Sequence, residues 1–349
     1  MKKITSIFLF ILISVLSISS VSALPEKAQM LPAFSSISDS QDRIWVGTFQ
    51  LVWNDFMDEV VKGPINFKNG TPKDALLLNK QEFKKSMLSD DSYYTAWGRT
   101  NPELKSKIEK DLWNKFQEKS VVLDKIDWND PFNAYLFYAM LKKDFKFHTK
   151  FEILDKEKFG NNKTEIPYFG LDKESPAYLY NGVDVLFYNN PFDYAVVLKS
   201  DNDQVILYRT NDNKSFDRLF SDLQKKSQKY KGNKKFIAGD QLKVPYMTIN
   251  QQTEFPELCK KEILTTNLYI DKAIQTVEFN MTRRGVKLKS EAVIDANFMS
   301  MPIKVKERGR NFFFNNTFVL FMKETNKNVP YFALRAKDMD LYKYAGEVD

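Results

Sequence analysis

The feature that most constrains this chain is a change in the spacing of its hydrophobic residues about halfway along. In the first half, one long segment has apolar residues at helical spacing: Trp45, Phe49, Val52, Trp53, Phe56, Met57 and Val60. From residue 184 onward, short runs rich in β-branched and aromatic residues follow one another, including VDVLFY, YAVVLKS and QVILYRT. Helices mainly in the first half and strands mainly in the second predict an α+β fold.

Shorter patterns complete the expected layout. Asn101-Pro102 predicts a capped helix start, and residues 215–229 also have helical spacing. DQLKVPYMTI, AIQTVEFNM, FVLFMKE and PYFALRAK are expected strands, the last two joined by a loop over residues 325–328. The run PFNAYLFYAML fits either a helix after Asp130-Pro131 or a buried strand, because its periodicity does not decide between them.

The N-terminus predicts export. Lys2 and Lys3 precede a short apolar run, and Val21-Ser22-Ala23 supplies the small residues that a signal peptidase requires. We expect a signal peptide over residues 1–23, a flexible leader over 24–40 and a single domain over 41–349. The mature chain is then 349 − 23 = 326 residues long. It is expected to be secreted or periplasmic, without a stable membrane span after cleavage.

Composition argues against most enzyme and nucleic-acid functions. A single histidine, His148, and a single cysteine, Cys259, exclude the usual zinc sites and an intrachain disulfide. Glycine-rich phosphate loops are absent, and the net charge of +7 is spread without a basic recognition motif. We expect no cofactor, no metal, no nucleic-acid partner and no enzymatic activity. A hydrolase that uses carboxylates alone stays open, since sequence does not place two carboxyl groups in one cleft.

Residues 286–297 alternate with a period of two. The first set is apolar or small: Val286, Leu288, Ser290, Ala292, Ile294 and Ala296. The second set is charged or polar in five of six positions: Lys287, Lys289, Glu291, Val293, Asp295 and Asn297. This pattern is typical of a strand with one buried face, in a register that a one-residue slip would destroy.

The order of motifs in the second half resembles that of serpins. DQLKVPYMTI with EFPELCKKEI is similar to a serpin strand and the short helix after it. KAIQTVEFNMTRRG resembles the central strand that leads into the reactive-loop hinge, and FNNTFVLFMKETNKNVPYFALRAK resembles the closing strand pair. FNAYLFYAMLKKDFKFHTKFE resembles, more weakly, an aromatic, lysine-rich serpin strand. The resemblance covers roughly residues 130–337.

The resemblance implies a monomeric inhibitor of an extracellular or envelope protease. In serpins an exposed loop is cleaved and inserts into the main sheet as a new strand. Gly285 would be the hinge, and the inserted side chains would include Val286, Leu288, Ser290 and Ala292. The hinge glycine of inhibitory serpins lies fourteen residues before the cleaved bond, which makes Met299-Ser300 the reactive bond. Methionine at this position suits elastase-, chymotrypsin- or subtilisin-like proteases.

Other interpretations stay open. Lys287, Leu288 and Lys289 are bulkier than the usual hinge residues, so slow insertion would make the protein a substrate. A non-inhibitory binding or structural protein of the cell envelope is therefore an alternative. Basic residues over 304–310 offer trypsin-like proteases a different bond. An ordinary hairpin over 274–296, with Arg283, Arg284 and Gly285 as its turn, also satisfies the alternation.

Overall fold

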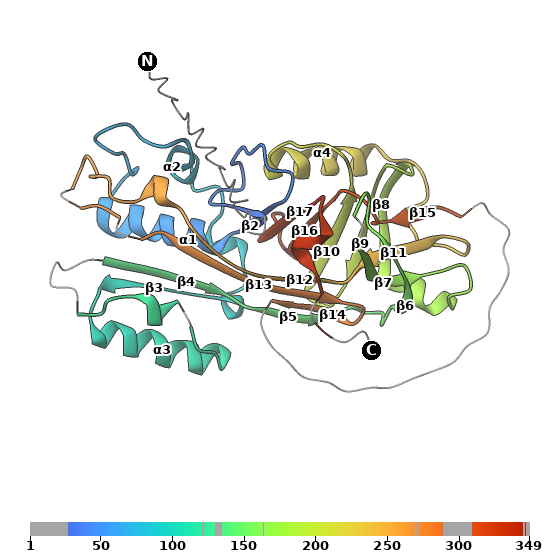
Figure 1. Cartoon of the computed structure of the whole chain (residues 1–349), viewed down its shortest axis with the longest axis horizontal. Coiled ribbons are helices and arrows are strands. Elements are labelled where there is room, and N and C mark those ends of the chain that lie inside the picture. Colours follow the sequence, from blue (N-terminus) through green and yellow to red (C-terminus); the bar gives the residue numbers. More distant parts are fainter. Residues whose placement is uncertain are drawn as a thin grey trace, which may run out of the picture.

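The computed structural model describes residues 27–120, 122–129, 135–162, 164–266, 268–270, 272–288, 309–344 and 346. Within these ranges the strands form three sheets and a two-stranded extension, arranged in an elongated molecule (Figure 1). The four α-helices of this part are α1 (Thr48–Phe56), α2 (Lys73–Leu78), α3 (Pro102–Phe116) and α4 (Phe216–Lys229). The α+β prediction is confirmed.

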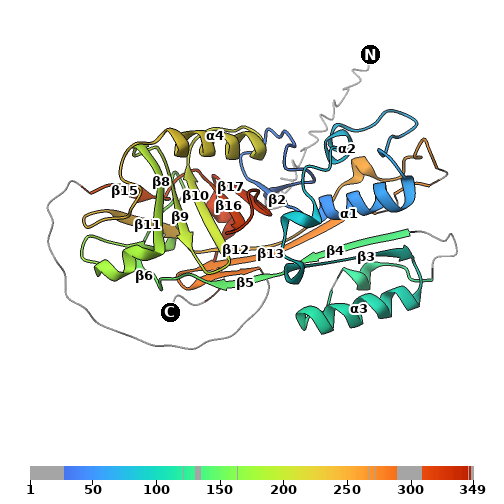
Figure 2. The same cartoon turned by 180° about the vertical axis from the view of Figure 1, so that it is seen from behind.

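The largest sheet has the strand order β1-β2-β17-β16-β10-β9-β8. Its strands are β1 (Gln29–Leu31), β2 (Arg43–Val46), β8 (Val183–Asn190), β9 (Asp193–Lys199), β10 (Asp203–Arg209), β16 (Phe318–Glu324) and β17 (Phe332–Ala336). The expected hairpins β9–β10 and β16–β17 are both present and antiparallel. Helix α4 lies along one face of this sheet, as both views show (Figures 1 and 2).

The prediction of a flexible leader over residues 24–40 is wrong from residue 27 onward. Strand β1 pairs in parallel with β2, with Met30 opposite Ile44. Ala28, Met30, Leu31 and Ala33 are buried in the core. The leader lacks a helical or alternating pattern, but burying these four apolar side chains stabilises the sheet edge and fixes the segment.

A smaller sheet has the order β15-β11-β7-β6. Its strands are β6 (Glu152–Lys158), β7 (Glu165–Leu171), β11 (Gln241–Pro245) and β15 (Asn311–Phe313). Pro245 is the last residue of β11 and lies opposite Tyr168 of β7.

The third sheet, called here the central sheet, has the order β12-β13-β14-β5. Its strands are β12 (Met247–Glu254), β13 (Ile274–Thr282), β14 (Gly285–Leu288) and β5 (Lys143–Lys146). Strand β4 (Tyr135–Leu141) directly precedes β5 along the same line, and it pairs with β3 (Tyr93–Arg99). The ambiguous run PFNAYLFYAML is therefore a strand over the part that the structure describes.

Helix α1 is shorter than the spacing of its apolar residues predicts. Trp45 belongs to β2, and the helix begins after Gly47 and continues into a π-helical turn over Met57–Val61. Helix α3 begins as expected, with the Asn101 side chain accepting a hydrogen bond from the Leu104 N–H. Its apolar face covers the outer side of β3 and β4, where Ile108, Leu112 and Tyr138 form a separate small core.

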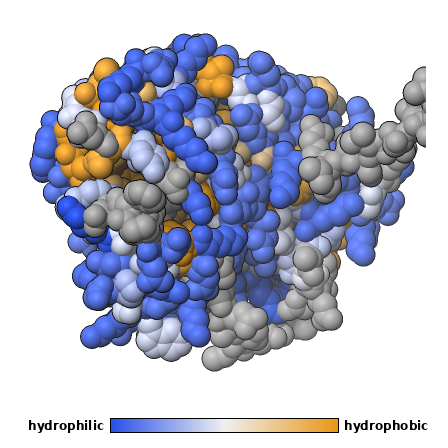
Figure 3. Space-filling view, turned by 60° about the vertical axis from the view of Figure 1, so that its left-hand side comes forward, coloured by the Kyte–Doolittle hydropathy of each residue, from blue (hydrophilic) through white to orange (hydrophobic). Residues whose placement is uncertain are grey.

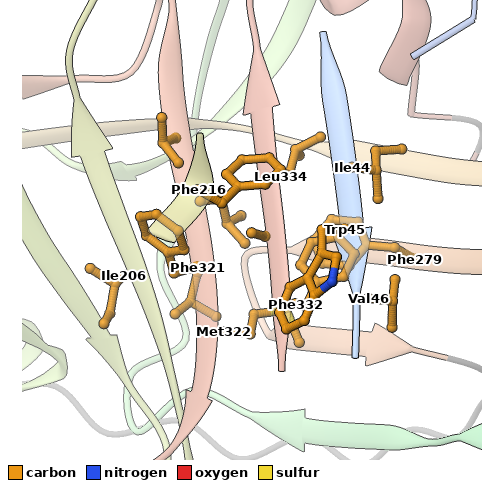
Figure 4. Close-up of a cluster of buried hydrophobic side chains, with 14 of the residues drawn as sticks. Ile44, Trp45, Val46, Ile206, Phe216, Phe279, Phe321, Met322, Phe332 and Leu334 are labelled. Carbon is orange, nitrogen blue, oxygen red and sulfur yellow. The ribbon is translucent and has the colours of Figure 1, made fainter. Parts of the chain in front are cut away.

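The main core lies where the central sheet meets the largest sheet. Val46 of β2 lies opposite Phe332 of β17 in the sheet, and the ring of Phe332 stacks on that of Phe279 of β13 at 5.0 Å (Figure 4). Phe321 of β16 packs against Phe216 of α4 on the other face. The core thus fixes β13 against the largest sheet, so the inner face of the central sheet has a rigid support.

Candidate functional site

The candidate site is centred on β14, which is a central strand. After a turn at Arg283 and Arg284, β14 runs antiparallel to β13, with Val286 opposite Met281. On its other side β14 runs antiparallel to β5, with Val286 opposite Phe145. Val286 is fully buried, so the apolar set of the alternating sequence faces the core at this position.

Gly285 is required by the close approach of β5. A β-carbon at this residue would overlap the carbonyl oxygen of Phe145 and lie 2.8 Å from the Cα of Lys146. Both are backbone atoms, which cannot move without shifting the strand. A residue with a side chain at 285 would therefore push β14 and β5 apart.

Of the predicted site residues, Gly285, Val286 and Leu288 lie in β14. Ser290, Ala292 and the predicted reactive bond Met299-Ser300 lie outside the described residues. Both the insertion hypothesis and the simpler hairpin interpretation expect the β13–β14 hairpin with its turn at 283–284, so the hairpin does not distinguish them. What separates these interpretations is the position of the residues after Leu288.

Beyond Leu288 a cavity of about 480 Å³ lies between β4 and β13. We call it the slot. One wall is formed by all of β4, residues 135–141, and the other by residues 272–278, which include the first part of β13. In the described chain, β4 pairs with β3 and has no hydrogen-bonded strand on its other edge. The slot thus continues the line of β14, bordered by two strand edges.

The floor of the slot is helix α1 with its aromatic side chains. Phe49, Trp53 and Phe56 line the cavity, and the ring of Phe56 lies 4.6 Å from that of Phe137 on β4. One polar side chain fixes β13 here, because the Gln275 side-chain amide donates both to the Val46 carbonyl and to the Thr48 hydroxyl. The floor is mainly apolar and suits apolar or small side chains entering from the central sheet.

Figure 3 looks toward the end of the molecule at the left of Figure 1. Most of its surface is hydrophilic, and hydrophobic side chains gather on one side of that end (Figure 3). Tyr269, which lines the slot, is 57% exposed.

A buried ionic cluster fixes β5 beside β14. The Lys143 ammonium lies 2.5 Å from Glu324 and 3.2 Å from Asp203, and all three side chains are less than a tenth exposed. Ser89 donates to Glu324 through both its N–H and its hydroxyl. Since Asp203 and Glu324 are opposite one another on β10 and β16, the cluster ties β5 to the largest sheet.

The two carboxylates of this cluster have opposite pKa shifts. Burial raises the pKa of Asp203 and outweighs the effect of Lys143. Burial acts in the same direction on Glu324, but hydrogen bonds from Lys143 and Ser89 outweigh it, and the net pKa is lowered. Glu324 is therefore the stronger anionic partner of Lys143.

Arg310 fixes the chain where it returns to the described structure. Its guanidinium lies 2.6 Å from the fully buried Asp240 and donates to the carbonyl oxygens of Asn233 and Lys235. It also lies 5.2 Å from the ring centre of Phe312 on β15. Residues 289–308 are therefore bordered by two fixed points, Leu288 in β14 and Arg310 beside β15.

The sequence analysis missed the Lys143 cluster and the Arg310–Asp240 pair. Lys143 follows Lys142, and only the strand alternation places one lysine inward and the other outward. Partners separated by 60 to 181 residues leave no local pattern in a single sequence. His148, the single histidine, lies 3.0 Å from Asp201 at the surface.

No helix of the described chain is long and apolar enough to cross a membrane. No protein-family model and no curated protein matches the sequence. Solved structures do match. The native state of Tengpin, a thermophilic serpin, is 11% identical over 90% of this chain and 97% of its own, with a TM-score of 0.53.

Two other serpin structures match less well. Serpin48 of the insect Tenebrio molitor is 12% identical, covering 72% of this chain and 78% of its own, with a TM-score of 0.40. Human thyroxine-binding globulin complexed with thyroxine is 10% identical, covering 81% and 94%, with a TM-score of 0.46. At these identities the match to Tengpin, with the sheet orders described above, establishes the architecture alone. The chain has a divergent serpin fold.

Proposed function

We propose that this protein is a secreted inhibitor of serine proteases that acts by cleavage of the segment after Leu288 and insertion of that segment into the slot. The observation that carries the proposal is the position of β14. Its four residues already lie between β13 and β5, and an open slot bordered by strand edges continues beyond them.

The register of β14 supports this assignment. Gly285 lies opposite Thr282 of β13 and Lys146 of β5. Because both pairings are antiparallel, each later residue of β14 lies opposite the preceding residue of each neighbouring strand. Continued beyond Leu288, the same register sets residues 289–296 opposite residues 142–135 on one side and 278–271 on the other. Of these, residues 135–141 and 272–278 line the two walls of the slot.

The alternation of the sequence fits the same register. Residues directly opposite in a sheet point to the same face. Ser290, Ala292 and Ile294 would therefore share a face with the inward-facing Val277, Gln275 and Ala273, all of which line the slot. The small side chains of Ser290 and Ala292 suit a space whose floor is already filled by α1.

The proposed chemistry requires one covalent step. The protease serine oxygen bonds to the carbonyl carbon of Met299, the Met299-Ser300 bond breaks, and Ser300 leaves as a protonated amine. The acyl-enzyme is trapped if insertion carries the ester away from the protease before water hydrolyses it. The bulk of Lys287 does not block this step, because Lys287 lies on the outward side, opposite Asn280 of β13 and Asp144 of β5.

The experiment mixes purified residues 24–349 with subtilisin, elastase, chymotrypsin and trypsin, followed by denaturing gels and mass spectrometry. The proposal expects a gel-stable adduct and a small fragment that begins at Ser300. Cleavage without an adduct would support the non-inhibitory alternative. The absence of preferential cleavage between 286 and 310 would refute the reactive loop altogether.

Val286→Asp serves as a matched variant in this experiment. A buried aspartate disfavours β14 between β13 and β5, because an unpaired charge is costly to bury. The proposal expects the variant to be cleaved as a substrate without an adduct. Lys287→Gln, one residue along and on the outward face, should retain the adduct.

A further inference from the structure

Among the residues that the structure describes, the outward face of the central sheet carries two charged side chains beside the slot that form no ion pair. On β13, Glu278 is half-buried and has no ion pair within the described part of the chain. Its neighbour on β12 is Asn250, which is uncharged. At the far end of the slot, Lys272 is exposed, and within the described residues it donates a long hydrogen bond of 3.4 Å to the Lys125 carbonyl.

Within β14 itself, the outward-facing lysine lies opposite a residue of opposite charge. Lys287 has Asp144 opposite it on β5 and the neutral Asn280 opposite it on β13. The one lysine of β14 thus has a carboxylate directly opposite it across the ladder. Cross-strand pairs of opposite charge stabilise a sheet, and like charges destabilise it.

If the chain after Leu288 continued in the register of β14, opposite charges would also pair beside the slot. Lys289 would lie opposite Glu278, and Asp295 would lie opposite Lys272. On the other side Lys289 would face Lys142, whose ammonium is 3.3 Å from Glu118 and is therefore already neutralised. We propose that the slot is a charge-matched site for residues 289–296 in a single register, with Glu278 and Lys272 as the residues that determine this register.

This inference rests on the proposed function. It explains how one register is selected for the inserted strand, which the alternation of polar and apolar residues alone does not determine. A slip by one residue is excluded because it exchanges the buried and exposed faces. A slip by two residues preserves both faces, so side-chain polarity alone does not prevent it. Such a slip in one direction brings Glu291 opposite Glu278. In the other direction it keeps a lysine, Lys287, opposite Glu278, but it replaces Asp295 by Val293 opposite Lys272.

The test is a charge-exchange cycle on the loop-cleaved protein. Glu278→Lys, Lys289→Glu and the double variant are each cut by the same protease within residues 297–308, and the Tm is measured before and after the cut. Each single variant should show a smaller rise in Tm than the parent, and the double variant should regain most of it. One cross-strand pair corresponds to about a two- to fivefold change in the insertion equilibrium.

The outcomes separate the two proposals. If the parent protein gains no stability on cleavage, insertion itself is refuted. If the parent gains stability and all four proteins gain equally, insertion stands and the charge-matched register is wrong. Thr276→Lys is a control on the same strand and face, two residues from Glu278. It should not reduce the rise in Tm, because its opposite residue in the proposed register is Glu291.

Discussion

Replacing Lys143 with methionine tests how β5 is held beside β14. At an effective dielectric constant of about 20, the attraction of Lys143 is roughly 7 kcal/mol to Glu324 at 2.5 Å and 5 kcal/mol to Asp203 at 3.2 Å. Desolvation of the ammonium offsets several kcal/mol of this attraction. Removing one partner of a buried pair leaves the other uncompensated, so we expect Lys143→Met to lower the free energy of unfolding by about 3–5 kcal/mol.

The loss should depend on pH. The pKa of Glu324 is lowered in the folded protein, so its stabilising contribution is present above its unfolded pKa of roughly 4.3 and is lost as pH falls through the folded pKa. Asp203 behaves oppositely, because its raised pKa favours the folded state at low pH. Without Lys143 both carboxyl groups bind protons more readily when buried. The deficit should therefore be largest near pH 7 and should shrink as the pH falls to 4.

Urea unfolding at pH 7 and at pH 4 measures both effects, with Lys146→Met as the matched control. Lys146 lies on the same strand, is exposed, and has no ion pair among the described residues, so its replacement should change the free energy of unfolding by less than about 0.5 kcal/mol. Equal losses for the two variants would refute the reasoning. So would a deficit in Lys143→Met that stays constant between the two pH values.

Three further outcomes are expected from single positions. Gly285→Ala should cost about 1–3 kcal/mol in urea unfolding, because its β-carbon meets the β5 backbone, and an unchanged midpoint would contradict that contact. Arg310→Met should cost about 3–5 kcal/mol by leaving Asp240 buried and unpaired, and adding Asp240→Asn should recover much of the loss. Asn101→Ala should cost about 0.5–2 kcal/mol through loss of the α3 cap, whereas Asn101→Asp should cost little.

Much of the architecture could be predicted from local patterns. Several strands are short apolar runs between turn residues, so the sequence predicts their boundaries: β8, β9, β10, β16 and β17. The start of α3 follows from Asn101-Pro102 for the same reason. The order of these elements led to the serpin resemblance, which the fold confirms.

What the sequence did not reveal depends on contacts between distant residues. Strand β1 is stabilised by burial against β2 and has no periodic pattern, so it was mistaken for a leader. Trp45 follows helical spacing but belongs to β2, because the chain changes direction at Gly47. The slot is bounded by β4 and β13, which are far apart in sequence, and no alternation within either strand indicates that their edges lie side by side.

Disulfide trapping tests the central claim, that residues after Leu288 enter the slot on cleavage. In a Cys259→Ser background, Ala139→Cys on β4 is combined with Ala292→Cys, its opposite residue in the proposed register, or with Val293→Cys, which faces the other way. Directly opposite residues in an antiparallel pair have Cα atoms about 4.5–5.5 Å apart, close enough for a disulfide. The account predicts a cross-link for the 139–292 pair after cleavage and none for 139–293. Failure of the 139–292 pair to cross-link in fully cleaved protein would contradict insertion.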